Sequence, residues 1–515
     1  MAKSRVENSF NNVATGMVLR VVTLLLSFIS RTAFIRILGD GCLGLNGLFT
    51  TILQMFSLAE LGIGQAITFY MYKPIADENK KRLVALVQFY KIAYRIIGFA
   101  IGAVGLVLLP FLPSIVNLDV DTGYNITVIY LLYLSNTVVS YLFFSYPRTV
   151  LSAHQQEYII NKVDSIFIIV STVAEILCLV LTGNFIVYLI ARLVLLIVKN
   201  VTLGVISLRK YPYIREKTDE KLGKSDIKQM FKDVYAIFVV KLSSQLFNST
   251  DNLFISAMLG TVLAGYNSNY LMIINAIYGV VSTVIYSCNA SVGNLCATGD
   301  KVQAENVFRT MDFINFWISC FCTVCLYRLL NPFITIVWGE KYLFSILTVA
   351  IMCFNFYIVS SLYSLFAFRQ GFGLFQYCIY NQLFAAILNI ILDYILCKMF
   401  GLVGLMIATM VANLLFCIFP YAKNLYKVGF EMPHKKYVLR IIRGMIICIG
   451  CCGITDLACL PFDNGILGFI CQVIASVVVS NGVMFLIFFK TEEFKKAKGY
   501  MLSLLSRFTS KLKRG

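Results

Sequence analysis

Long apolar runs follow one another along almost the whole chain, and this feature constrains the fold more than any other. The stretch VLRVVTLLLSFISRTAFIRILGDG, Val18 to Gly41, is an early example. A helix needs about 20 mainly apolar residues to cross the hydrocarbon core of a bilayer. Only 14% of the residues are charged and 59% are hydrophobic, whereas soluble domains are about 25% charged. The sequence therefore predicts an all-α polytopic membrane protein.

Polar breaks divide these runs into fourteen candidate transmembrane helices. Very short turns around Gly183 and Gly401 join neighbouring helices. No small-residue cleavage site follows the first run, so we expect it to stay in the mature protein. The helices are predicted to begin near Val13, Gly44, Val84, Tyr124, Ile159, Phe185, Val234, Ala264, Asp312, Phe344, Gln376, Leu402, Arg443 and Gly465.

Basic residues are concentrated in alternate connections between these helices. RKYPYIREKTDEKLGKSDIKQMFK and AKNLYKVGFEMPHKKYVLRIIR are strongly basic, whereas the longest loop on the other side, PFLPSIVNLDVDTGYN, has no Lys or Arg. Cytoplasmic loops carry the excess of basic residues. We therefore expect both termini in the cytoplasm, and we read the net charge of +18 as a property of cytoplasmic loops, not of nucleic-acid binding.

The last residues form a basic segment with an apolar face. At helical spacing, Phe494, Met501, Leu505, Phe508 and Leu512 share one side among Lys and Arg residues. Such a helix suits the anionic inner leaflet of a membrane. We interpret residues 490–515 as a basic amphipathic cytoplasmic tail that contacts anionic lipids, with a plain solvated tail as the alternative.

The sequence contains an internal repeat of about 220 residues. LGDGCLGLN, Leu38–Asn46, matches LGTVLAGYN, Leu259–Asn267, at an offset of 221, and EYIINKVDSIFIIVSTVAEILC, Glu157–Cys178, resembles QYCIYNQLFAAILNIILDYILC, Gln376–Cys397, at an offset of 219. Transporters are often built from duplicated bundles. The repeat predicts two six-helix lobes of equal orientation, related by a pseudo-two-fold axis along the membrane normal, with helices 13 and 14 outside it.

These features give the expected organisation of the chain. It comprises an N-lobe at 1–208, a basic cytoplasmic linker at 209–233, a C-lobe at 234–425, helices 13 and 14 at 426–489, and the tail at 490–515.

A polar stripe runs along the first predicted helix. Arg20 and Arg31 lie on one face about 16 Å apart, with Ser27 between them. An arginine at the centre of a bilayer costs at least about 2.5 to 3.5 kcal/mol, so Arg31 needs water, a carboxylate or an anionic ligand. The repeat offset places Lys241 opposite Arg20. The predicted substrate-binding residues of a central cavity are Arg20, Arg31, Lys241, Asn248 and Asn252. For Arg20 and Lys241 the alternative is that they reach the nearby cytoplasmic interface.

Each of the other polar residues inside the predicted spans has two possible roles. The carboxylates Glu60, Glu175 and Asp393 are candidates for ion coupling and, equally, for structural ion pairs. Four amides at repeat-related places suit sugar hydroxyls or hydrogen bonds between helices. They are Asn46, Gln54, Asn267 and Asn275.

Metal and cofactor sites are not predicted. The sixteen cysteines lie almost wholly inside apolar runs, where we read them as small buried hydrophobes. His154 and His434 are the only histidines, and neither has neighbouring Cys, Asp or Glu residues at ligand spacing.

The segment FIRILGDGCLGLNGLFTTILQMFSLAELGIGQAITFYMYKPIADENKKRLVALVQFYKIAYRIIG, Phe34–Gly98, resembles the N-terminal signature of bacterial polysaccharide flippases of the Wzx type. That superfamily also holds the multidrug and toxin extrusion (MATE) exporters and the lipid II flippases. The resemblance implies a MATE-like V of two lobes, alternating access, and residence in the bacterial cytoplasmic membrane. It implies as substrate an oligosaccharide linked by diphosphate to undecaprenol, and as partners other membrane proteins of polysaccharide assembly. The cations that would hold the diphosphate are Arg20, Arg31 and Lys241, with Arg36 at the outer interface as a further candidate.

Three other functions remain as alternatives. A multidrug exporter of the same fold usually expels cations and would line its cavity with carboxylates, whereas this stripe is basic. A polysaccharide polymerase needs large outward loops, which this chain lacks. A small-solute symporter would need a broken-helix substrate site, and none is evident. Moving a lipid across the bilayer breaks no bond, so we expect a flippase without catalytic residues.

Overall fold

The computed structural model describes most of the chain. The described residues are 2–56, 70–71, 74–75, 77–112, 123–142, 145–154, 156–216, 218–220, 222–224, 227–231, 234–235, 238, 242, 250–286, 288–297, 300–374, 379–462 and 465–499. Side chains are described from Val22 onward, with exceptions that include Leu24 and residues 54–56. The chain divides into two compact units, Met1–Asn267 and Ser268–Gly515.

The described residues are almost entirely helical, which confirms the predicted fold class. Nine of their helices are long and apolar enough to cross a membrane, and α5 (Ile126–Leu142) is a shorter apolar helix. One of the nine segments, Tyr380–Phe430, is 51 residues long and exceeds the length of a single span. The total of fourteen spans stays a prediction, because several expected helices fall on residues outside the described ranges.

The repeat reappears in the backbone conformation at two glycines. In α1 (Ala2–Phe56), Gly39 has φ 79° and interrupts the helix. Gly260, which lies 221 positions later, has φ 109° and separates the short π-helical turn η4 (Ile255–Leu259) from α10 (Thr261–Tyr286). A positive φ strains any residue with a Cβ atom. The repeated Leu-Gly pair therefore encodes the same break in both copies.

Glycine also forms the two short turns that the sequence predicts. Gly183 adopts φ 59° after α7 (Glu157–Thr182) and before α8 (Phe185–Lys210). The Asn184 side chain then accepts bonds from the amides of Ile186 and Val187, at 2.8 and 3.4 Å, which starts α8. Gly401 has φ 58° inside α14 (Ile379–Ala412).

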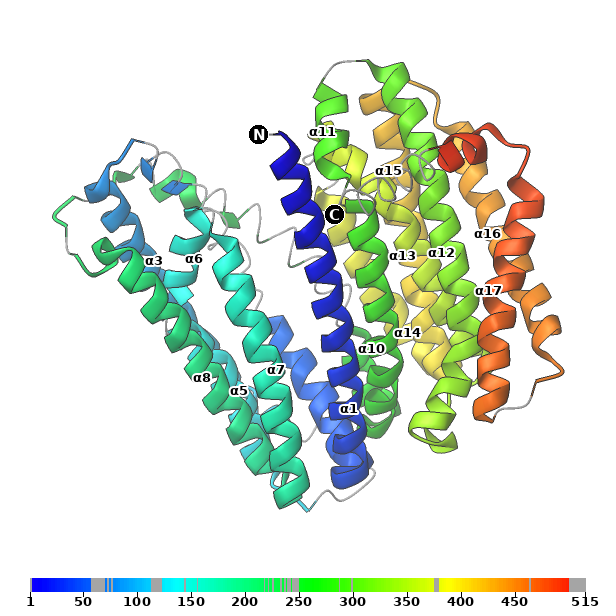
Figure 1. Cartoon of the computed structure of the whole chain (residues 1–515). Helices are drawn as coiled ribbons and strands as arrows, with labels where there is room; N and C mark the ends of the chain where they lie inside the picture. Colours follow the sequence, from blue (N-terminus) through cyan, green and yellow to red (C-terminus); the bar gives the residue numbers. More distant parts are fainter. Residues whose placement is uncertain are drawn as a thin grey trace. The chain divides into compact units, whose positions relative to one another are not determined.

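The first unit is a helical bundle. Its remaining helices are α3 (Lys80–Val107) and α6 (Ser145–Ala153), with the short turns η2 (Leu109–Phe111) and η3 (Pro212–Arg215). Helix α1 packs on α5 and α7, while α5 also packs on α3 and α8 (Figure 1). Phe34 of α1 meets Phe185 and Tyr188 of α8 edge to face, with ring centroids 5.3 and 5.5 Å apart. These contacts hold the polar residues of α1 beside α5, α7 and α8.

The second unit is built around α12 (Lys301–Val337), which packs on α13 (Ile346–Gly371), α16 (Lys435–Cys459) and α17 (Ile466–Phe488) (Figure 1). Asp300 caps α12 by accepting a bond from the Gln303 amide at 2.9 Å. The helix therefore begins eleven residues before the expected start of its span, Asp312. The unit also contains α11 (Asn289–Ala297), η5 (Glu340–Tyr342), η7 (Asn413–Ile418), α15 (Phe419–Asn424) and η8 (Leu425–Phe430).

The start of the predicted cytoplasmic tail packs on this unit. Phe494 stacks on Trp317 of α12, with ring centroids 5.7 Å apart, and also contacts Phe485 of α17. Residues 500–515, with the rest of the predicted apolar face, lie outside the described residues.

His154, at the end of α6, packs against the start of the predicted linker. Its ring stacks on Tyr211 at 4.0 Å, and its Nε2 lies 3.0 Å from the Tyr213 hydroxyl. Burial lowers the pKa of His154 below its usual value near 6.5, because the charged ring is poorly solvated there. The neutral ring therefore stabilises this contact fully above about pH 6.5, and that contribution is lost as the pH falls toward the lowered pKa.

Acidification is therefore expected to loosen residues 211–216. Hydrogen exchange of these amides, corrected for the intrinsic rate, should be severalfold faster at pH 5 than at pH 7.5. His154→Phe keeps an aromatic ring without a titrating nitrogen and should remove the pH dependence. Equal pH dependence in the variant would contradict this role of His154.

Candidate functional site

The polar stripe of α1 can be followed in the structure only from Ser27 onward. Arg20 belongs to α1, but its side chain lies outside the described part of the structure, as does that of Gln54. Lys241, Asn248 and Glu60 also lie outside the described residues. Ser27 donates to the carbonyl of Thr23 at 2.8 Å. The described part of the predicted site therefore centres on Arg31.

Arg31 is half-buried among helices of the first unit. Its Nη2 donates to the carbonyl oxygen of Gly265 at 3.4 Å, and its guanidinium lies in the neighbourhood of Tyr133 and Tyr188. Gly265 belongs to the second copy of the repeat, so this bond joins the two copies. A carbonyl group solvates the guanidinium without adding a negative charge.

Tyr188 lies between two charged side chains. Arg192 is on α8, one turn further along the same helix, and interacts with Tyr188. Glu175 of α7 interacts with both Tyr188 and Arg192. Tyr133 of α5 and Tyr188 are both buried, at 3% and 6% exposure. We call Arg31, Tyr133, Glu175, Tyr188 and Arg192 the arginine–tyrosine cluster.

This cluster is positively charged. Two guanidinium groups and one carboxylate give it a formal charge of +1 (2 − 1). Glu175 is the carboxylate of the cluster, and Arg192 lies near it. Charged groups in a low-dielectric setting are stable only when they are paired or hydrogen-bonded. The cluster therefore places two guanidinium groups among apolar helices, an arrangement that can bind an anionic group.

Three predicted amides form hydrogen bonds between helices. Asn267 donates to the Oδ1 of Asn252 at 2.8 Å, and Asn252 donates to the hydroxyl of Thr51 at 3.2 Å. The Tyr133 hydroxyl donates to the Oδ1 of Asn46. Asn275 is exposed on α10. Asn46, Asn252 and Asn267 thus each make a hydrogen bond in this structure, and Asn252 connects the predicted stripe to α1.

Two repeat-related glycines make the closest backbone approach in this region. Gly44 and Gly265 are 221 positions apart, and a Cβ atom at Gly44 would lie 2.4 Å from the carbonyl oxygen of Thr261. A Cβ at Gly265 would lie 2.8 Å from the backbone nitrogen of Gly44. Small residues permit such close helix crossings in membranes. The two copies of the repeat therefore meet where neither has a side chain. Leu45 and Tyr266 are the next residues in the two copies.

Asp393 lies in the second unit, on α14, and is fully buried. Its Oδ1 accepts a bond from the amide of Asn389 at 3.1 Å, and the same amide lies 3.4 Å from the Thr409 hydroxyl. The helical spacing of Asn389 and Asp393 places both on one face. The buried carboxylate is thus bonded by the Asn389 amide, which also lies near the Thr409 hydroxyl.

The described residues contain no group of three or more His, Cys, Asp and Glu side chains that could hold a metal ion. The described cysteines are free thiols, many of them buried, as the sequence suggests.

Sequence reasoning did not select Arg192, Tyr188 or Tyr133 as site residues. The spacing of Tyr188 and Arg192 inside the apolar run FIVYLIARLVLLIV is the signal that could have found them, because an arginine four residues after a tyrosine can bond it on one helix face. Tyr133 has no such signal, because its partners Asn46 and Thr50 come from α1.

Comparisons with known proteins bear on the family and the fold of the chain. Residues 9–287 match the family described as "Polysaccharide biosynthesis protein". No curated protein matches the chain. Among solved structures, the lipid II flippase MurJ in an inward closed conformation has a TM-score of 0.70 at 13% identity, over 92% of this chain and 98% of that one.

Two further structures are similar to this chain. An inward-facing multidrug resistance MATE family transporter of the MOP superfamily has a TM-score of 0.61 at 14% identity, over 80% of this chain and 99% of its own. The MATE transporter VcmN of Vibrio cholerae has a TM-score of 0.55 at 15% identity, over 83% and 98%. The chain therefore has the fold that these membrane transporters share. Because the family match extends over more than half of the residues, the chain belongs to the polysaccharide biosynthesis protein family.

Proposed function

We propose that the protein moves undecaprenyl-diphosphate-linked oligosaccharide repeat units from the inner to the outer leaflet of the bacterial cytoplasmic membrane by alternating access. The observation that carries the proposal is the positively charged arginine–tyrosine cluster inside a bundle of apolar helices. A cation at this depth has a cost in free energy, and an anionic substrate group would offset it. The membership of a polysaccharide biosynthesis family supplies the sugar part of the proposal.

The chemistry of a diphosphate fits the guanidinium groups of the cluster. A diphosphate carries about two negative charges, and arginine forms two parallel, charge-assisted hydrogen bonds to such oxygens. Arg31 already donates to a neutral carbonyl, which a phosphate oxygen can replace as acceptor. The lipid tail stays in the bilayer, so the protein has to solvate only the head group and the sugars.

In this proposal Arg20 and Lys241 extend the basic path toward the cytoplasmic side, with Asn248 and Asn252 on the same stripe. Asn46, Gln54, Asn267 and Asn275 are the proposed sugar-contacting amides. Further proposed partners are anionic inner-leaflet lipids, which would bind the basic tail, and other membrane proteins of polysaccharide assembly. Both termini would lie in the cytoplasm.

Binding of matched lipids separates this function from drug export. The purified full chain in lipid nanodiscs should bind an undecaprenyl-diphosphate oligosaccharide at least about tenfold more tightly than the same oligosaccharide on undecaprenyl monophosphate, because one charged hydrogen bond contributes about 1.5 to 3 kcal/mol. A lipophilic cationic dye should not compete. Equal binding of both lipids, or displacement by the dye, would favour a cation-coupled multidrug or solute exporter.

We propose Asp393 as the group that couples transport to an ion gradient. Buried carboxylates within spans are costly and commonly mark ion pathways, and Asp393 is bonded by a neutral amide. Glu60 is a further candidate, whereas Glu175 belongs to the arginine–tyrosine cluster.

Asp393→Asn keeps the shape of the side chain and removes its charge. The variant is expected to lose the acceleration of flipping that an imposed proton or sodium gradient gives the wild type, as measured in reconstituted vesicles with each gradient in turn. Asp456→Asn, which removes an exposed partner of Arg328 at 3.3 Å, is the matched control. Undiminished gradient dependence in Asp393→Asn would exclude it as the coupling group.

A further inference from the structure

A cavity of about 360 Å³ lies inside the second unit, between α12, α13, α16 and the end of α17. Arg309, Arg440 and Arg443 contribute positive charge to its lining, and Asp312 and Glu493 contribute negative charge. The loops that precede α12 and α16 and the chain that follows α17 are the ones that the sequence assigns to the cytoplasmic side. The cavity therefore lies at the cytoplasmic end of the predicted spans.

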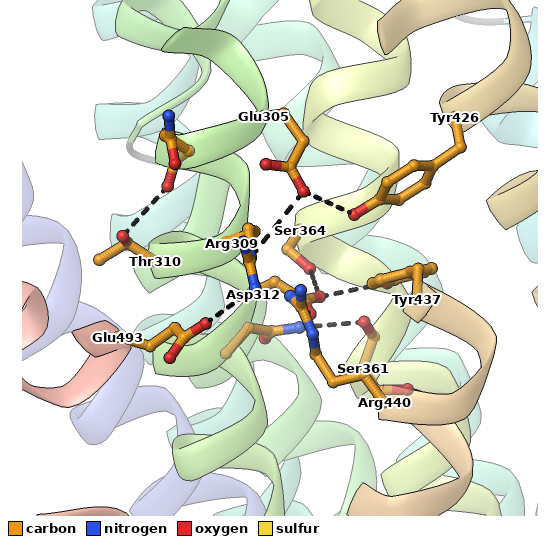
Figure 2. A network of polar contacts seen from close by, with 12 residues as sticks. Glu305, Arg309, Thr310, Asp312, Ser361, Ser364, Tyr426, Tyr437, Arg440 and Glu493 are labelled. Carbon is orange, nitrogen blue, oxygen red and sulfur yellow. Dashed lines mark hydrogen bonds and ion pairs between the residues drawn. The ribbon is translucent and has the colours of Figure 1, made fainter. Parts of the chain in front are cut away.

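A polar network holds Asp312 at the wall of this cavity (Figure 2). Its Oδ1 accepts bonds from Ser364 of α13 at 2.8 Å and from Tyr437 of α16 at 3.2 Å. Its Oδ2 lies 3.5 Å from Nη1 of Arg440. Asp312 is 8% exposed, so the carboxylate is fully engaged by its neighbours and does not repel an incoming anion strongly.

The two other wall charges also balance each other. Nη2 of Arg309 lies 3.3 Å from Glu493, and its Nε lies 3.9 Å from Glu305. These pairs join α12 to the segment after α17, and Figure 2 shows Arg309 between the two glutamates. The charge of Arg309 is therefore compensated by the two glutamates.

Arg443 and Arg440 retain capacity for an anion. Within the described residues, the exposed side chain of Arg443 makes no ion pair or hydrogen bond. The Nη1 atom of Arg440 is buried and has no well-formed hydrogen bond, despite its proximity to Asp312. The two arginines are three positions apart on α16, so they project from neighbouring positions on one face.

An apolar wall forms another part of the cavity and reaches the outer surface of the unit. Phe313 and Phe316 of α12 and Phe488 of α17 line it, and so does Leu439 of α16, whose side chain is 67% exposed. Large exposed apolar side chains continue along α16, including Ile446. In a membrane helix such a surface faces lipid, so the cavity opens where acyl chains and head groups meet.

We infer that this cavity binds the phosphate head group of an anionic phospholipid from the inner leaflet, with its phosphodiester on Arg440 and Arg443 and an acyl chain on the phenylalanine-lined wall. Basic pockets between transmembrane helices on the cytoplasmic side are suited to such head groups. A free phosphate would use the arginines but would leave the apolar wall without a partner. The bound lipid would hold α16 against α12. This inference does not depend on the flippase proposal.

Titration of the purified full chain in a neutral detergent tests the inference. Phosphatidylglycerol is expected to raise the unfolding temperature, whereas phosphatidylcholine with the same acyl chains and inorganic phosphate should each leave it nearly unchanged. Arg443→Ala should weaken the apparent affinity for phosphatidylglycerol about fivefold or more, because one basic contact to an anionic lipid is lost. Arg443→Lys, which keeps the charge, should restore most of it.

Lys435→Ala is the matched control, since it removes a cation from an exposed position at the start of the same helix and outside the cavity. An equal loss in Lys435→Ala and Arg443→Ala would mean diffuse attraction and would overturn the inference. It would also be overturned if phosphatidylcholine stabilised the protein equally, or if inorganic phosphate alone reproduced the effect. A photoreactive phosphatidylglycerol should label peptides of α12 and α16, and labelling confined to other helices would contradict the site.

Discussion

Replacement of Arg31 by alanine is expected to reduce flipping of an undecaprenyl-diphosphate oligosaccharide to about a tenth of the wild-type rate or less. Arg31 supplies one of two guanidinium groups in the arginine–tyrosine cluster and donates to Gly265 from α1. Loss of a charged hydrogen bond to the diphosphate would remove about 1.5 to 3 kcal/mol of binding. The flipping rate of Arg31→Lys should fall between those of the wild type and Arg31→Ala, because an ammonium keeps the charge without the forked donors. Lys241→Ala is expected to abolish flipping for the same electrostatic reason.

Arg95→Ala is the matched control for Arg31→Ala. Arg95 lies on α3 of the same unit and is exposed, so its removal changes the net charge equally and leaves the cluster intact. Membrane insertion and unfolding temperature should be similar in all these variants. If Arg31→Ala flips as fast as Arg95→Ala, the cationic site is not where the diphosphate binds.

The second large effect is expected at the glycine contact between the repeats. Gly44→Val would place a branched side chain where even a Cβ lies 2.4 Å from the Thr261 carbonyl. Backbone cannot move aside as a flexible side chain does, so the helices must separate. Overpacking of this kind costs about 1 to 3 kcal/mol. We expect loss of flipping and faster labelling of a cysteine introduced at Leu45 or Tyr266, since the variant cannot adopt the closed contact.

Gly102→Val tests whether any added bulk has this effect. Gly102 is also a helical glycine of the first unit, but a Cβ there meets only Val138 at 3.6 Å, an ordinary contact. This variant should keep most of its flipping activity. Normal transport by Gly44→Val, with unchanged labelling at the neighbouring positions, would show that the approach of Gly44 and Gly265 has no part in the transport cycle.

The membrane fold could be predicted because its signals are local. The length and composition of apolar runs identify spans without knowledge of their partners. The short turns are also local, and their glycines Gly183 and Gly401 adopt positive φ, as do the repeat-related Gly39 and Gly260. Only a residue without a Cβ fits such positions readily.

The candidate site was predictable in part. Arg31 was identified because an arginine inside a span requires a partner, but that partner is the carbonyl of Gly265, 234 positions away. Every residue has a backbone carbonyl, so the sequence cannot indicate which one an arginine will bond. Asn252 and Asn267 were recognised as polar residues within spans, yet only the packing of helices decides that they bond each other and Thr51.

The network in the second unit shows the same limit. Asp312 marks the expected beginning of a span in the sequence, because a carboxylate at the edge of an apolar run reads as an interface residue. In the structure α12 starts earlier, and the carboxylate is buried against Tyr437, which is 125 positions away. Contacts at such separation depend on which helices pack together, and periodicity within one helix contains no information about that choice.

The rate at which the reconstituted protein moves a defined undecaprenyl-diphosphate oligosaccharide across vesicles is the most direct test of the central claim. Sugar that starts in the inner leaflet and becomes accessible to an external lectin measures the movement. We predict rapid movement with the wild type, slow movement with Arg31→Ala, and none beyond the background of protein-free vesicles when the lipid has no phosphate. Movement no faster than in protein-free vesicles, or equal rates for the phosphate-free lipid, would contradict the claim.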